Sequence, residues 1–90
     1  MSLTPMWNLT YKNWIFSEHI QSQMSKRKID GNLVEMTIDS PDEVIPAEQD
    51  RLIYQKVINN KLVRIVTEDN TLVTVYVTSK IRKYLGVRKL

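Results

Sequence analysis

The stretch RLIYQKVINNKLVRIVTEDNTLVTVYVT, residues 51–78, decides the fold. It holds three segments rich in β-branched and aromatic residues, at 51–58, 61–67 and 71–78, and this composition is typical of β-strands. Asn59-Asn60 separates the first two segments and residues 68–70 separate the last two, and both breaks are short and polar, as hairpin turns are. The stretch therefore predicts three antiparallel strands in a meander.

Side chains alternate between the two faces of a strand, so each segment divides into two sets. One set is nearly all apolar and is expected to face the core: Ile53, Gln55, Val57, Val63, Ile65, Val73, Val75 and Val77. The other set combines cations, phenols and threonine hydroxyls: Leu52, Tyr54, Lys56, Leu62, Arg64, Val66, Thr74, Tyr76 and Thr78. We expect a functional site, if there is one, on this second face.

Two helices are expected before the sheet. Ser17 is a good N-cap for a helix that runs to about Lys28, and Asp30 can cap a second one. Ser40-Pro41 ends the second helix because the residue before proline avoids the helical region. The sequence predicts an α+β domain with both helices on one face of a three- to four-stranded antiparallel meander. Residues 42–50 add an edge segment, and residues 79–85 form a short basic helix or tail.

The chain is expected to be a single domain over residues 1–90, with residues 1–5 as a poorly ordered leader. Trp7, Tyr11 and Trp14 recur at spacings of four and three, which fits one face of a helix. We therefore expect residues 6–16 to form an irregular or helical lead-in that covers one edge of the core.

Composition excludes several classes of site. The chain has no cysteine, which excludes disulfides and thiol catalysis, and its one histidine argues against a metal site built on imidazoles. We expect no metal and no cofactor. No apolar run has transmembrane length, so a soluble cytoplasmic protein is expected. The net charge of +3 is compatible with an anionic partner.

Several short motifs occur in an order that resembles the domain of unknown function family DUF4258. They cover roughly residues 16–85 and comprise His19-Ile20, Gln23-Met24, Arg27, Ile29, Ser40 to Ile45, Tyr54-Gln55-Lys56, Leu62 to Val66, Val73 to Lys80, and Lys83-Tyr84-Leu85. The family pattern usually has alanine after the histidine and an arginine four residues beyond it, where this chain has Ile20 and Gln23. The helix-then-sheet plan is similar to that of small metal-independent ribonucleases and of messenger-cleaving toxins such as the RelE-like proteins.

This resemblance implies a toxin-like, metal-independent ribonuclease or an RNA-binding relative of one. Such cleavage needs a base, an acid and fixed donors that stabilise the charge on phosphorus. The candidate catalytic residues are His19, Arg64 and Tyr76, because imidazole titrates near neutrality and a guanidinium grips phosphate with two donors. The candidate RNA- or phosphate-binding residues are Lys26, Arg27, Tyr54, Thr78 and Lys80.

Structural explanations compete with each of these roles. His19 is also explained as a half-buried helix histidine bonded to a neighbour, and Arg64 as the partner of Glu43 or Glu48 in a surface ion pair. The alternative function is a non-catalytic interaction module. Its partner would be a second copy in a homodimer or a cognate antitoxin-like protein, because an unpaired sheet edge invites pairing. A third hypothesis is that the chain is itself an antitoxin or the regulatory partner of a toxin–antitoxin pair.

Overall fold

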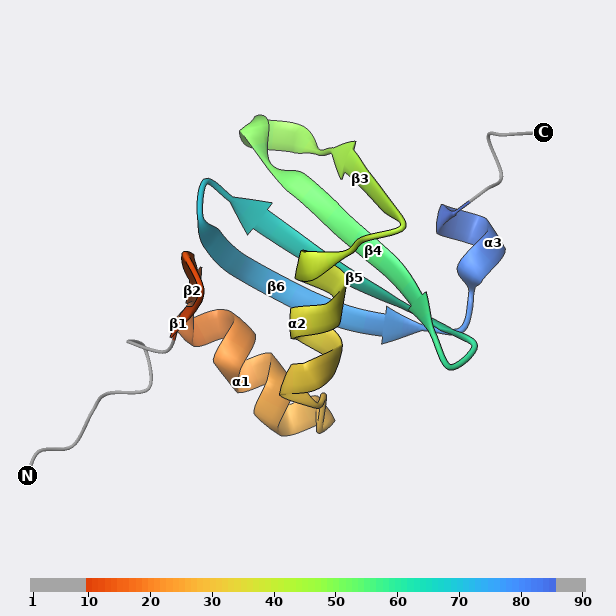
Figure 1. Cartoon of the computed structure of the whole chain (residues 1–90), viewed down its shortest axis with the longest axis horizontal. Coiled ribbons are helices and arrows are strands. Elements are labelled where there is room, and N and C mark those ends of the chain that lie inside the picture. The colour runs from red at the N-terminus through yellow and green to blue at the C-terminus, as the bar shows by residue number, and fades with distance from the viewer. Residues whose placement is uncertain (1–9, 86–90) are drawn as a thin grey trace, which may run out of the picture.

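The computed structural model describes residues 10–85, which fold into a six-stranded sheet with two longer helices and one single-turn helix (Figure 1). The elements along the chain are β1 (Thr10–Tyr11), β2 (Trp14–Phe16), α1 (Glu18–Arg27), α2 (Gly31–Asp39), β3 (Glu43–Pro46), the 3-10 turn η2 (Glu48–Asp50), β4 (Leu52–Ile58), β5 (Lys61–Glu68), β6 (Thr71–Thr78) and α3 (Ile81–Tyr84). The α+β class is confirmed, and the short helix expected near the C-terminus is α3.

The predicted three- to four-stranded antiparallel meander is wrong. The strand order is β1-β2-β6-β5-β4-β3, and β2 pairs with β6 in parallel. The error lies in residues 10–16, which form a small hairpin and not a helical lead-in, with Lys12 in the left-handed region at the turn. These residues form strands and not a helix because the pairing of β2 with β6 buries Phe16 in the core beside Leu72. Trp7 and the expected leader lie outside the described residues.

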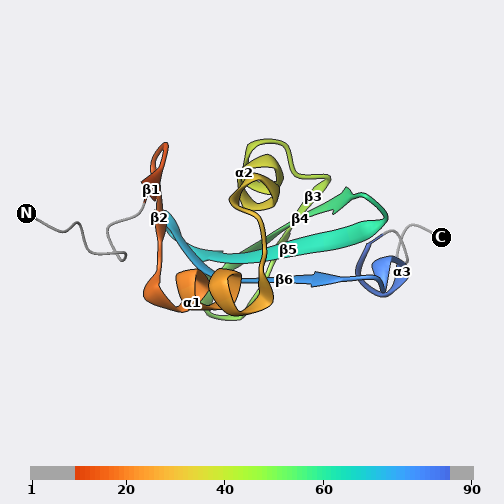
Figure 2. The same ribbon diagram turned by 90° about the horizontal axis from the view of Figure 1, so that it is seen from below.

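The helices begin and end where the sequence predicts. Ser17 accepts a hydrogen bond from Ile20 N at 3.0 Å, Lys28 ends α1 in the left-handed conformation, and Asp30 caps α2 by accepting from Asn32 N. Their placement differs from the prediction of two helices on one face. α2 covers one face of the sheet, whereas α1 lies along the outer edge of β6 (Figure 2). The reason is that β2 covers only the start of β6, and α1 covers the next part of that edge as far as Val75.

One face of the sheet, the core face, carries Val63, Ile65 and Val75 and packs against α2. These three valine and isoleucine side chains are fully buried. The remaining members of the apolar cluster come from the helices, from β2 and from the start of β6: Phe16, Ile20, Val34, Ile38 and Leu72. This cluster joins α1, α2 and β2 to the two central strands β5 and β6.

The opposite face, which we call the arginine face, carries Gln55, Arg64 and Tyr76 in register on β4, β5 and β6. The predicted assignment of β4 to faces is therefore wrong, because Gln55 lies opposite Arg64 while Tyr54 lies opposite Ile65 on the core face. The turn explains the error. Asn59 and Asn60 form a two-residue turn with positive φ angles, and such a turn pairs odd residues of one strand with even residues of the next.

Candidate functional site: a buried arginine between two tyrosines

Arg64 stands at the centre of the arginine face and is only 7% exposed. Its Nε donates to Gln55 Oε1 at 2.8 Å, and its Nη1 donates to the hydroxyl of Tyr76. The Tyr84 ring from α3 lies over the guanidinium, with Cζ 4.0 Å from the ring centroid, and the Tyr76 ring centroid is 5.4 Å away. A guanidinium against an aromatic face is a favourable cation–π contact. Arg64 thus holds Tyr76 and Tyr84 in fixed positions.

Gln55 connects this cluster to the rest of the sheet. It is completely buried, and its Nε2 donates to Glu43 Oε1 at 2.8 Å and to the carbonyl of Tyr84 at 3.2 Å. Each end of the amide therefore has a partner, as a buried polar group requires. The sequence interpretation missed both Gln55 and Tyr84 as members of the cluster. A glutamine among apolar residues in a strand was the available signal.

Tyr76 and Tyr84 form an edge-on aromatic pair with ring centroids 6.3 Å apart. Burial raises the pKa of the Tyr76 phenol above its ordinary value, against the opposing effect of the Arg64 guanidinium. The phenol is therefore protonated at neutral pH. It accepts the hydrogen bond from Arg64 as a neutral oxygen.

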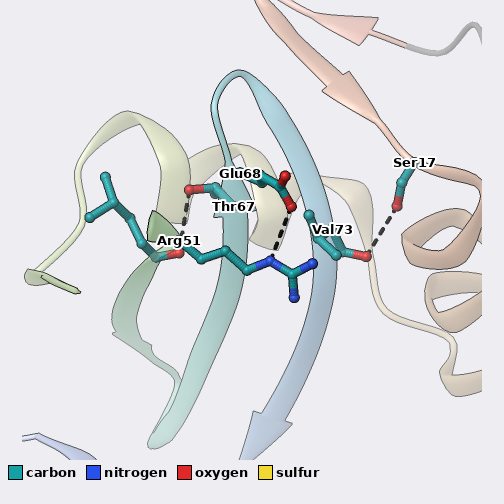
Figure 3. Close-up of polar contacts among 6 residues, drawn as sticks. Ser17, Arg51, Thr67, Glu68 and Val73 are labelled. Carbon is teal, nitrogen blue, oxygen red and sulfur yellow. Dashed lines mark hydrogen bonds and ion pairs between the residues drawn. The ribbon is translucent and has the colours of Figure 1, made fainter. Parts of the chain in front are cut away.

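His19 lies on α1 and is exposed. The residues one and two turns further along this helix bind the edge of β6: Gln23 Oε1 accepts from Val75 N at 2.9 Å, and Arg27 Nη1 donates to Val75 O at 3.3 Å. Ahead of the helix, the Ser17 hydroxyl donates to the carbonyl of Val73 (Figure 3). Within residues 10–85 no contact joins His19 to Arg64. The structure does not bring the two principal catalytic candidates together.

The remaining candidates lie in three different places. Thr78 shares the arginine face and accepts a hydrogen bond from Lys80 N at 3.1 Å, so both lie beside the tyrosine pair at the end of β6. Tyr54 lies on the core face, where its ring packs edge-on against Trp14 at 5.5 Å, and this removes it from the cluster. Lys26 is exposed near the end of α1.

Exposed cations predominate at one end of the sheet, and exposed carboxylates predominate at the other. The acidic end comprises η2 and the turn between β5 and β6, with Glu48, Asp50, Glu68 and Asp69 exposed there; Arg51 Nε donates to Glu68 Oε1 at 3.1 Å (Figure 3). The basic end comprises the turn between β4 and β5 together with the residues after β6, and it exposes Lys61, Lys80, Arg82 and Lys83. Two acidic residues from the start of β3 also lie there: Asp42 Oδ2 accepts from Val57 N, and Glu43 Oε1 accepts from Gln55 Nε2, both at 2.8 Å. No Asp or Glu follows Asp69 in the sequence. The tyrosine pair lies at the basic end.

In the described part of the chain, no three His, Cys, Asp or Glu side chains gather in a way that could hold a metal ion. None of the helices in residues 10–85 is long and apolar enough to cross a membrane.

The sequence model of the domain of unknown function DUF4258 matches residues 16–77. The chain belongs to this family. In this DUF4258 domain the matched region includes Gln55, Arg64 and Tyr76 but stops before α3, so Tyr84 and the exposed cations after β6 lie outside it. No curated protein and no solved structure matches the chain significantly. The wider resemblance to small ribonucleases and RelE-like toxins therefore stays a prediction.

Proposed function

We propose that this domain binds single-stranded RNA at the basic end of its sheet, with Tyr76 and Tyr84 as the surface on which bases stack. The observation that carries the proposal is the position of this half-buried aromatic pair beside Lys80, Arg82 and Lys83, on β6, α3 and the residues between them, none of which is acidic. Proteins that bind single strands combine these two features, aromatic faces for the bases and cations for the backbone.

The geometry around Tyr84 fits both halves of this chemistry. The Lys83 Nζ lies 5.3 Å from the centroid of the Tyr84 ring, so a cation stands next to the proposed stacking surface. Arg64 contacts the same ring and orders it. Because the rings are held in place before RNA arrives, little conformational freedom is lost on binding.

Binding has more support than cleavage. Two donors of Arg64 are engaged by Gln55 and Tyr76, and the guanidinium is covered by Tyr84, so it does not offer a phosphate a two-point grip. Cleavage without a metal needs an acid and a base at the same phosphate. His19 has no contact with the arginine cluster within residues 10–85. We therefore assign Arg64 to positioning the tyrosines, and we place RNA binding ahead of ribonuclease activity.

The first experiment measures binding of a fluorescent oligouridine by anisotropy for the wild type, Tyr84→Phe and Tyr84→Leu. Stacking on an aromatic ring contributes about 1–3 kcal/mol per base. We expect Tyr84→Leu to weaken binding by about tenfold or more and Tyr84→Phe to retain it. Equal loss in both variants would contradict a stacking role.

The second experiment tests the basic end. The double variant Arg82→Gln/Lys83→Gln is expected to lower the slope of log affinity against log salt concentration by about 0.7 for each phosphate contact removed. The matched control is Arg51→Gln, which removes a cation from the acidic end and is expected to leave the slope unchanged. An equal effect of Arg51→Gln would mean that only net charge matters.

A third experiment tests for cleavage. A denaturing gel of the RNA after incubation with the protein in chelator is expected to show intact strands. Cleavage by the wild type that is lost in His19→Ala would restore the ribonuclease prediction.

A further inference from the structure

The outer edge of β6 exposes backbone groups in an alternating pattern. In an antiparallel pair every second residue directs its N–H and C=O away from the partner strand. Val75 is such a residue, because its N–H donates to Gln23 and its carbonyl accepts from Arg27, both on α1. Val77 is two positions further and pairs with Val63 as Val75 pairs with Ile65. The N–H and C=O of Val77 therefore also point outward from the sheet.

α1 does not reach Val77. Arg27 is the last residue of the helix, its side chain ends on the Val75 carbonyl, and Lys28 turns the chain away in the left-handed conformation. No residue within 10–85 donates to or accepts from the outward backbone groups of Val77, and its side chain is 37% exposed. Among residues 10–85, β2 and α1 thus close the edge of β6 over most of its length and leave its end open.

The other long edge of the sheet is less suited to pairing. β3 has only four residues and ends in Pro46, which has no N–H to donate. Short edge strands and proline are known protections against strand addition. The open end of β6 has neither protection, and this difference singles it out as a docking position.

Charge limits what can dock there. Along this edge of the sheet, Arg27 lies on one side of Val77 and Lys80 lies on the other, and both are exposed. Neither β6 nor α3 contains an acidic residue. A second copy of the chain would bring the same cations against each other, whereas an acidic segment would meet opposite charge. We propose that the open end of β6 at Val77 takes an extended acidic peptide segment of a partner protein as an added strand.

This proposal does not depend on RNA binding, and the test uses a synthetic peptide with alternating valine and glutamate. Amide hydrogen exchange of the full chain is followed by NMR as the peptide is added. We expect the Val77 amide to exchange rapidly in the free protein and to slow by about tenfold or more when the peptide is saturating. The same peptide with lysine in place of glutamate is expected to leave the Val77 amide unchanged. Equal slowing by both peptides would overturn the assignment of an acidic partner.

Two substitutions at Val77 and one modified peptide test whether the peptide binds as an added strand. Val77→Pro removes the outward N–H without removing a bond to β5 and is expected to weaken peptide binding by about tenfold, whereas Val77→Thr keeps it. A peptide N-methylated at alternate amides tests the same bonds if Val77→Pro fails to fold, and it is also expected to bind about tenfold more weakly. Full binding of the methylated peptide, or slowing of the Val77 amide by oligouridine and not by the acidic peptide, would overturn the proposal.

Discussion

The two faces of β5 are both buried, but they are buried by different kinds of contact. Leu62, Val63, Arg64 and Ile65 follow one another in this strand, and none is more than 7% exposed. On the core face Ile65 meets the apolar side chains of α1 and α2, while on the arginine face Arg64 is enclosed by an amide and two phenol rings.

This difference shows that the two faces of one strand place different demands on their side chains. The core face needs only apolar volume and shape, which many side chains supply. The arginine face needs particular donors, acceptors and rings, because each buried polar atom must find a partner. Substitutions on the core face should therefore lower global stability, while substitutions on the arginine face should also release α3.

The largest loss of stability is expected from Ile65→Ala. Ile65 is completely buried among apolar side chains, and truncation of such a residue lowers the free energy of unfolding by about 2–5 kcal/mol. Urea denaturation followed by circular dichroism measures the change. Val77→Ala is the matched control, since Val77 lies on the same face but is 37% exposed, and it should change the free energy of unfolding by no more than about 0.5 kcal/mol. Similar losses of unfolding free energy in both variants would contradict the distinction between the packed centre of the sheet at Ile65 and the open end of β6 at Val77.

A smaller loss of stability is expected from Arg64→Lys. A lysine has no planar fork to bond Gln55 and Tyr76 together while stacking on Tyr84, so we expect a loss of about 1–3 kcal/mol in the free energy of unfolding. Faster hydrogen exchange in α3 would show that this helix is released. Arg51→Lys, in the exposed pair with Glu68, is the control and should have little effect. Unchanged exchange in α3 of Arg64→Lys would mean that Arg64 does not hold Tyr84.

The smallest effect is expected where the β1–β2 hairpin contacts the end of α2. Tyr11 and Lys12 both donate to the Asp39 carboxylate, and these hydrogen bonds, that of Tyr11 first, lower the pKa of Asp39 below 3.8. A lowered pKa in the folded state means that the stabilisation is present above the unfolded value and is lost as the pH falls through the folded value. We expect Asp39→Asn to lower the melting temperature slightly at pH 7 and not at all at pH values below the folded pKa of Asp39.

The control for this pH dependence is Asp69→Asn, in the turn between β5 and β6, which should show no such difference between the two conditions. If the melting temperature of Asp39→Asn stayed below that of the wild type at low pH, then shape, and not charge, would hold the hairpin to α2.

Local signals predicted a large part of the fold. Ser17 and Asp30 cap the helices, Asn59-Asn60 forms the expected turn, and β4, β5 and β6 lie where β-branched residues are dense. Residues 10–16 escaped prediction because a short aromatic run fits helix and strand alike, and only its partner β6 decides between them.

The candidate site was predicted in part. Arg64 and Tyr76 do lie together on one face, as the alternation within β5 and β6 indicated. Tyr54 and Gln55 were exchanged between the faces, because the register across a two-residue turn was not counted. The place of Tyr84 depends on how α3 folds back onto the sheet, and no pattern within α3 carries that information.

The sequence by itself determined the elements, their caps and turns, the uneven placement of charge and the family, because each depends on residues close together in the chain or on their order. Only the tertiary structure decided which face each side chain joins, that α1 closes an edge of β6, and that Arg64 is covered by Tyr84. These outcomes depend on contacts between distant residues, whose free energies emerge only when the sheet register and the packing of the helices are fixed together.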